Sequence, residues 1–546
     1  MAELVYQTIG QLLDEQAKKY PKHEALVYAD RDLRLTYEEL NQQSRLVARG
    51  LLALGIEKGD HIAVWTTNVP EWVQLQFGTG KMGAPIVTVN TNYRAHELEY
   101  LLRQSDAKTI ILIENFRDHS FIHTLQEICP ELEHCEPGNL QSKRLPLLKN
   151  VILIGETKYP GVLNWSDVLA SAKQVTEQQL DQIQASLHYD DVINIQYTSG
   201  TTGFPKGVML THYNLVNNAV NIAECMRLTS ADRLCIPVPF FHCFGCVIGT
   251  LAITTSGGTM VPVQEYASAE VLRTVEKEKC TALHGVPTMF ISELNLQNFS
   301  SYDLSTLRTG VMAGSNCPIE VMKAVIEKMG MTDITICYGQ TESSPVITQT
   351  RADDPFHLKV ETVGRALPNL EVKIVVPGTD VEAPINEQGE LCTRGYHVMK
   401  GYYNNQEETQ LAIDQDGWLH TGDLATMDED GYVRVTGRLK DMIIRGGENL
   451  YPREIEEFLY TFPKIADVQV AGVPDPKYGE EAAAWIILRE GEQATEEEIR
   501  AFCRDKISKH KIPRHIFFID SYPMTASGKV QKFKLREEFL AAVKVK

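Results

Sequence analysis

Tyr-Thr-Ser-Gly-Thr-Thr-Gly-Phe-Pro-Lys-Gly, residues 197–207, is the most informative stretch of this chain. Residues 191–196 just before it predict a short buried strand, so the glycine-rich segment should form the turn at a strand end. Glycines let backbone N–H groups approach a ligand, hydroxyl groups donate further hydrogen bonds, and lysine adds a positive charge. This combination suits a polyphosphate. It is not the Walker pattern G-x-x-x-x-G-K-[ST], because Pro205 precedes Lys206 and Gly207 follows it.

Four other short motifs follow along the chain. They are YGQTE at residues 338–342, WLHTGD at 418–423, GRLKD at 437–441 with EIE at 454–456, and PMTASGK at 523–529. A single Gly-Thr turn is usually an ordinary loop, and a single Asp beside one is usually a turn residue. Motifs in a fixed order over nearly the whole chain are far more specific than any one of them.

Together these motifs resemble those of the acyl-adenylate-forming superfamily, which includes acyl-CoA synthetases, adenylation domains of peptide synthetases and beetle luciferases. The resemblance implies an AMP-forming acid–thiol ligase that uses ATP, Mg²⁺ and CoA. In such an enzyme a carboxylate attacks the α-phosphate of ATP, which gives acyl-AMP and pyrophosphate, and a thiol then displaces AMP. Because each step concentrates negative charge, catalysis depends mainly on positioning and on preorganised positive charge.

The apolar pattern predicts an α/β fold with a large, multi-subdomain N-terminal domain built on parallel sheets. Residues 36–39 form a capping box, after which apolar residues recur at helical spacing up to Gly55. Strands are expected at residues 61–66, 85–89, 109–113, 151–154, 192–196, 281–285 and 333–338. From about 362 to 437 the pattern changes to short strands, such as 370–376 and 390–394, and predicts a small β-barrel-like region.

The resemblance divides the chain into an AMP-binding N-terminal domain, residues 1–439, and a small mobile α+β lid, residues 440–546, with a hinge near Lys440. Within this lid the sequence predicts helices near 452–461 and 495–508 and strands near 468–473 and 482–488.

Composition and charge restrict the class of partner. A chain of 546 residues exceeds one hydrophobic core, and its net charge of −19 argues against a nucleic-acid-binding protein. Eleven cysteines without a framework spacing indicate a reduced, cytoplasmic compartment, and no signal peptide is expected at the N-terminus. Residues 234–264 carry no charged side chain, but their prolines and glycines favour a buried helix, a turn and a strand over a membrane span. Peripheral membrane contact and the oligomeric state stay open.

The resemblance also assigns site residues by motif. The phosphate loop supplies Thr198, Ser199, Gly200, Thr201, Thr202, Gly203, Phe204, Pro205 and Lys206, of which Thr198 and Lys206 are expected to be catalytic. The rest of the nucleotide is expected to contact Gly314, Ser315, Tyr338, Gly339, Thr341, Asp423 and Arg438.

The remaining assignments concern the metal, the acid and CoA. Glu342 would ligate Mg²⁺, and Lys529 would bind ATP and bridge the acid carboxylate and the α-phosphate. Rotation at Lys440 would then withdraw Lys529 and bring the glycines Gly446 and Gly447 beside the pantetheine arm of CoA.

Residues 240–245, FFHCFG, match the family's aromatic and histidine motif that borders the acid site. His242 would orient the carboxylate or gate its entry, and a core histidine is an equal alternative. No Asp accompanies this motif to hold an amino group, which favours a simple carboxylic acid. The apolar segment 234–264 favours a medium- or long-chain fatty acid. An aromatic or branched acid, a luciferase-type oxidoreductase and a carrier-protein-acylating enzyme stay open as alternatives.

Overall fold

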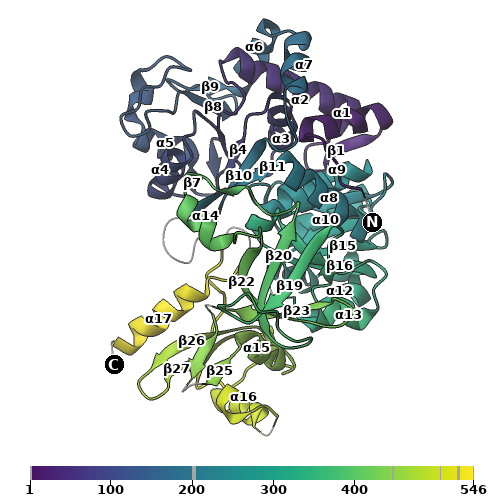
Figure 1. Ribbon diagram of the computed structural model, residues 1–546, viewed down its shortest axis with the longest axis vertical. Coiled ribbons are helices and arrows are strands. Elements are labelled where there is room, and N and C mark those ends of the chain that lie inside the picture. Colours follow the sequence, from purple (N-terminus) through teal and green to yellow (C-terminus); the bar gives the residue numbers. More distant parts are fainter. Residues whose placement is uncertain are drawn as a thin grey trace.

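The computed structural model describes residues 3–198, 205–315, 317–439, 441–445, 448–504, 506–525 and 529–544. Two large sheets and a smaller antiparallel sheet form the part before residue 440, and the residues after it form a separate lobe (Figure 1). The predicted α/β class with parallel sheets is therefore confirmed.

An eight-stranded sheet carries the glycine-rich segment at one strand end. Its spatial order is β21 (Gly401–Tyr402), β11 (Lys206–Thr211), β10 (Val192–Thr198), β4 (Ile86–Thr88), β3 (Ile62–Trp65), β5 (Thr109–Ile113), β8 (Asn150–Ile154) and β9 (Leu163–Asn164). The strands from β10 to β9 run parallel, whereas β11 is antiparallel to both of its neighbours. Thr198 pairs with Lys206, so the two described ends of the predicted phosphate loop lie side by side.

A nine-stranded sheet brings the other nucleotide motifs to one edge. Its order is β18 (Arg365–Ala366), β17 (Val346–Gln349), β16 (Asp333–Gly339), β15 (Thr309–Met312), β14 (Ala282–Gly285), β12 (Arg233–Ile236), β13 (Thr259–Pro262), β1 (Glu24–Tyr28) and β2 (Leu33–Thr36). The strands β14, β15 and β16 run parallel, so the carboxyl ends from which residues 314–315 and 338–342 continue face the same way.

Helices cover these sheets, and the helix predicted after residues 36–39 is present. The capping box is formed by the side chains of Thr36 and Glu39. The helices are α1 (Ile9–Lys19), α2 (Tyr37–Ala53), α3 (Pro70–Met82), α4 (Ala95–Gln104), α5 (Phe121–Ile128), α6 (Trp165–Ser171), α7 (Glu177–Ala185), α8 (His212–Cys225), α9 (Ala252–Ser256), α10 (Ser268–Glu278), α11 (Pro287–Leu294), α12 (Ile319–Met329), α13 (Phe356–Glu361) and α14 (Gln406–Ala412). Short helical turns are η1 (Pro130–His134), η2 (Ala172–Gln174), η4 (Phe299–Ser301) and η5 (Thr341–Ser343), and β6 (Asn115–Phe116) pairs with β7 (His119–Ser120).

The uncharged segment 234–264 is packed inside the large domain. It contains a π-helix, η3 (Phe244–Leu251), which continues into α9 and ends at Gly257, where φ is +78°. Strand β13 follows, as the sequence predicts. Among the described residues, we find no helix with the length and apolar character needed to span a bilayer.

The third sheet contains the strands β19 (Leu370–Val375), β20 (Gly389–Gly395), β22 (Leu419–Met427) and β23 (Val433–Arg438). They pair in this order and are antiparallel throughout. The region expected to resemble a barrel is thus an open sheet within the described chain, because the strands pair in a linear order from β19 to β23.

The lobe after residue 440 has its own sheet and apolar clusters. Its strands are β24 (Ile443–Arg445), β25 (Glu448–Leu450), β26 (Ile465–Asp475), β27 (Gly479–Leu488) and β28 (His515–Phe518), and its helices are α15 (Pro452–Tyr460), α16 (Glu496–Cys503), η6 (Lys509–Lys511) and α17 (Lys532–Lys544). Ile455, Val470 and Ile486 are buried in one cluster, away from the cores of the large sheets. Helix α16 ends five residues earlier than expected, at Cys503.

Candidate active site

Tyr338, Asp423 and Arg438 come from three strands and meet at one carboxylate. The Tyr338 hydroxyl donates to Asp423 Oδ2 at 2.7 Å, and Arg438 Nε donates to Asp423 Oδ1 at 3.1 Å. Asp423 and Arg438 are also paired residues in the β22–β23 ladder. Burial raises the pKa of Asp423, and the charge of Arg438 opposes this rise. Since a carboxylate oxygen can accept more than one hydrogen bond, Asp423 retains capacity for the two hydroxyl groups of a ribose.

The charge of Lys529, a residue of the C-terminal lobe, acts on this group. Its loop is held by Thr525 N, which donates to Lys529 O at 2.7 Å, and by Lys529 N, which donates to Thr525 Oγ1 at 3.0 Å. Burial lowers the pKa of Lys529, as does the charge of Arg438, whereas Asp423 and Glu342 raise it. A lysine from the lobe therefore shares one electrostatic environment with the predicted ribose and metal residues.

Glu342 lies in η5 directly after β16, and Tyr402 holds it. The Tyr402 hydroxyl donates to Glu342 Oε1 at 2.8 Å. The ring of Tyr402 also faces Lys206, whose Nζ lies 4.4 Å from the ring centroid and donates to Glu408 Oε2 at 2.9 Å. One tyrosine thus links the predicted metal ligand to the predicted phosphate lysine.

Glu342 fits a magnesium ligand in type and place. Its carboxylate offers the hard oxygen donors that Mg²⁺ prefers, and Mg²⁺ is usually bound through one or two carboxylates plus substrate phosphates. The nearby Lys206 and Lys529 would face those phosphates. Mg²⁺ would supply charge neutralisation on the phosphate oxygens.

His242 is half-exposed beside the same centre. Phe244 N donates to His242 Nδ1 at 3.2 Å, so the proton of the neutral ring lies on Nε2. Burial and the charge of Lys529 lower the pKa of His242 to about 3. The ring is therefore neutral at pH 7 and able to donate one hydrogen bond to a carboxylate. A pKa lowered by burial fits a core histidine as well, so the role of His242 at the site stays a prediction.

At two strand ends the backbone has a conformation or makes a close contact that favours glycine. Gly314 has φ of +90°, a left-handed conformation that side chains rarely adopt, and it precedes Ser315. A Cβ on Gly339 would lie 1.9 Å from Pro345 O, so only glycine fits there. Thr341 is buried at the start of η5.

Part of the predicted site lies outside the described residues. This applies to Ser199, Gly200, Thr201, Thr202, Gly203 and Phe204 of the phosphate loop, to the hinge residue Lys440, and to Gly446 and Gly447. Thr198 and Pro205 flank the loop and are described. Tyr402 and Glu408 are contacts that sequence reasoning missed, because no local pattern marks either residue as a partner of residues 206 or 342.

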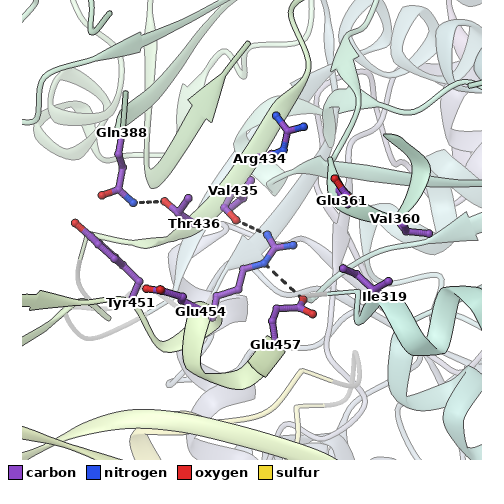
Figure 2. A pocket seen from close by; sticks show the side chains of 11 residues that line it. Ile319, Val360, Glu361, Gln388, Arg434, Val435, Thr436, Tyr451, Glu454 and Glu457 are labelled. Carbon is purple, nitrogen blue, oxygen red and sulfur yellow. Dashed lines mark hydrogen bonds and ion pairs between the residues drawn. The ribbon is translucent and has the colours of Figure 1, made fainter. Parts of the chain in front are cut away.

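A cavity of about 400 Å³ lies away from these residues, in the seam between the large domain and the lobe. Ile319 and Val360 line one wall, while Tyr451, Glu454 and Glu457 of the lobe line another (Figure 2). The side chain of Arg453 bridges the seam and donates to the carbonyl oxygen of Val435 in β23. A hydrogen bond therefore joins the lobe to the large domain beside this cavity.

Comparison with known protein families settles the relationship. The model of the AMP-binding enzyme family matches residues 13–403, and that of the AMP-binding enzyme C-terminal domain matches residues 454–529. The chain belongs to the AMP-binding enzyme family.

Individual members of this family are similar to the chain over nearly its full length. The putative acyl-CoA synthetase YngI of Bacillus subtilis (strain 168) is 62% identical over 538 residues, with 98% of both chains covered. The human medium-chain acyl-CoA ligase ACSF2, mitochondrial, is 44% identical, with 97% of this chain and 87% of the relative covered. The crystal structure of the anthranilate CoA ligase AuaEII in complex with anthranoyl-AMP superposes with a TM-score of 0.87 at 28% identity, with 99% of both chains covered. The predicted class, an AMP-forming acid–thiol ligase, is thereby confirmed.

Proposed function

We propose that this AMP-binding enzyme activates a medium- or long-chain fatty acid as acyl-AMP and then transfers the acyl group to CoA. The single observation that carries the proposal is the cluster in which Tyr338 and Arg438 both donate to the Asp423 carboxylate, which also lies within the field of the Lys529 charge. This arrangement suits the adenylation step, in which an acid carboxylate and the α-phosphate of ATP, both anionic, must be brought together.

Each residue of the site has a distinct task in this proposal. Asp423 would accept the ribose hydroxyl groups, and Tyr338 would offer its ring to adenine. Lys529 would lie between the acid carboxylate and the α-phosphate and would stabilise the negative charge as pyrophosphate leaves. The Nε2–H group of neutral His242 would donate to the acid carboxylate and orient it.

The phosphate side of the site would be held by the hairpin of β10 and β11. Lys206 would leave Glu408 and meet the β- and γ-phosphates together with Thr198 and the intervening loop residues 199–205. Glu342 would hold Mg²⁺ there, with its carboxylate fixed by the Tyr402 hydroxyl. The ring of Tyr402 packs against Lys206 and would keep it in reach of both Glu408 and the phosphates.

The second half-reaction would require a different arrangement of the lobe. We propose that residues 1–439 and 440–546 are two domains that rotate about Lys440, which withdraws Lys529 and brings Gly446 and Gly447 to the acid site. The separate apolar clusters of the lobe and the cavity in its seam with the large domain support this motion.

The name of the human relative, a medium-chain acyl-CoA ligase, supports a fatty acid, as does the uncharged segment 234–264, which contains His242. The complex of AuaEII with anthranoyl-AMP keeps an aromatic acid as the second candidate, since its whole-chain similarity is high.

A panel of acids tests the proposal. Saturated acids of increasing chain length and an aromatic set, including anthranilate, would be assayed for acid-dependent exchange of pyrophosphate into ATP without CoA. The same panel would then be assayed for AMP release with CoA. We expect exchange and thioester formation with medium or long chains. Release of ADP and phosphate would refute the reaction, and a preference for aromatic acids would refute only the substrate.

A further inference from the structure

The strand that carries Asp423 is distorted immediately before this residue. In the β20–β22 ladder, Cys392 pairs with His420 and Glu390 pairs with Leu424, so one residue of β20 lies opposite three residues of β22. Gly422, inside this bulge, has φ of +71°. Bulges redirect a side chain at the cost of ladder hydrogen bonds, and this one sets the direction of Asp423.

The side chain of Glu390 accepts a backbone hydrogen bond inside the bulge and also contacts the ring of His420. Gly422 N donates to Glu390 Oε1 at 3.0 Å, and His420 Nδ1 lies 3.1 Å from Glu390 Oε2. Because a carboxylate is an acceptor, His420 is the donor in the second contact. Glu390 is only 8% exposed, so its two oxygens hold the backbone of Gly422 and the ring of His420 in a place that water reaches poorly. Thr421 Oγ1 donates to Leu391 O at 2.7 Å and fixes the middle of the bulge.

We propose that Glu390 is a positioning residue for nucleotide recognition: it holds the bulge at residues 420–423 so that both oxygens of Asp423 face the ribose hydroxyl groups. This inference rests on the ribose-binding role of Asp423 in the proposed function. Glu390 itself does not touch the nucleotide. Its effect should therefore appear only through the hydroxyl groups that Asp423 binds.

The same cluster has a second chemical interpretation. Cys392 Sγ lies 3.4 Å from His420 Nδ1, and Glu, Cys and His side chains are the donors that Zn²⁺ takes in proteins. However, one Glu390 oxygen is engaged by Gly422 N and the other by the His420 ring. Both oxygens of Glu390 thus already hold parts of the bulge, and we assign the carboxylate to positioning.

Calorimetric binding of ATP and of 2′,3′-dideoxy-ATP to the full-length protein tests this inference without any turnover. The ratio of the two dissociation constants measures recognition of the ribose hydroxyl groups. For Glu390→Ala we expect ATP to bind about 10- to 100-fold more weakly, the usual loss for hydrogen bonds to a charged group, with dideoxy-ATP changed by less than about threefold. Glu390→Gln keeps an acceptor for Gly422 N and should lose less than Glu390→Ala.

Two further variants complete the design. Glu371 is an exposed glutamate of the neighbouring strand β19 and forms an ion pair with Arg394. Glu371→Ala should leave the ratio of the two dissociation constants unchanged. Asp423→Ala combined with Glu390→Ala should weaken ATP binding no more than Asp423→Ala does, because both act on the same contact.

The possible outcomes separate the hypotheses. Equal weakening of both nucleotides in Glu390→Ala and Glu390→Gln, with unchanged melting temperature, would overturn the positioning role. Stoichiometric binding of Zn²⁺ that is lost in Cys392→Ser and in Glu390→Gln would overturn it in favour of a metal site. A wild-type protein that binds both nucleotides equally would instead refute the ribose-binding role of Asp423. Should Glu390→Ala fail to fold, the Glu390→Gln ratio decides alone.

Discussion

Replacing Lys529 by alanine should separate the two half-reactions. The ammonium group of Lys529 is half-buried among the charges of Asp423, Glu342 and Arg438, and burial has already lowered its pKa. Two opposite unit charges about 4 Å apart attract each other by about 4 kcal/mol at an effective dielectric constant of about 20. Only the part that grows toward the transition state accelerates the reaction, which for one preorganised group corresponds to about 10²- to 10³-fold. Adenylation should slow by this factor.

Rapid-quench measurements of each half-reaction provide the assay. Acyl-AMP formation would be followed after mixing enzyme, acid and ATP, and thioester formation after mixing enzyme with synthetic acyl-AMP and CoA. Lys529→Ala should be slow in the first and close to wild type in the second. Lys529→Met keeps the length of the side chain without its charge and should behave like alanine. Lys534→Ala removes an exposed lysine of α17 and is the matched control. Equal damage to both half-reactions by Lys529→Ala would refute a role confined to adenylation.

Three further predictions follow from particular contacts. First, kcat/KM for ATP should fall as the pH rises, at a pH below the ordinary lysine pKa, because burial lowers the pKa of Lys529 and its protonated form is the active one. Lys529→Arg should move this fall to higher pH, and an unchanged pH profile would exclude Lys529 as its cause. Second, Tyr402→Phe should raise the Mg²⁺ concentration for half-maximal exchange by about 10-fold or more, since the hydroxyl no longer holds Glu342; an unchanged Mg²⁺ titration would contradict this. Third, Arg453→Ala should slow adenylation by about 2- to 10-fold and spare thioester formation from acyl-AMP, because the lobe loses the hydrogen bond from Arg453 to Val435 O. Rapid-quench data in which thioester formation slows and adenylation does not would contradict this prediction.

The sequence predicted those features that depend on neighbours in the chain. The strand at residues 109–113 has the predicted bounds, and the Thr36–Glu39 capping box forms as expected. These succeed because apolar runs and caps obey local rules of burial and hydrogen bonding. The return strand β11 was not among the predicted strands, because it gains its place only by pairing with β10 and β21.

The order of short motifs was enough to identify the family. Through that resemblance it also predicts Asp423, Arg438, Glu342 and Lys529 as site residues. The tertiary structure decided how these residues are held. Glu390 supports the bulge before Asp423, although the two residues come from different strands and neither has a local pattern that marks the contact. Tyr402 reaches Glu342 in the same way, from another sheet. A local motif determines which groups are present, whereas burial and long-range strand pairing determine which groups meet and with what charge.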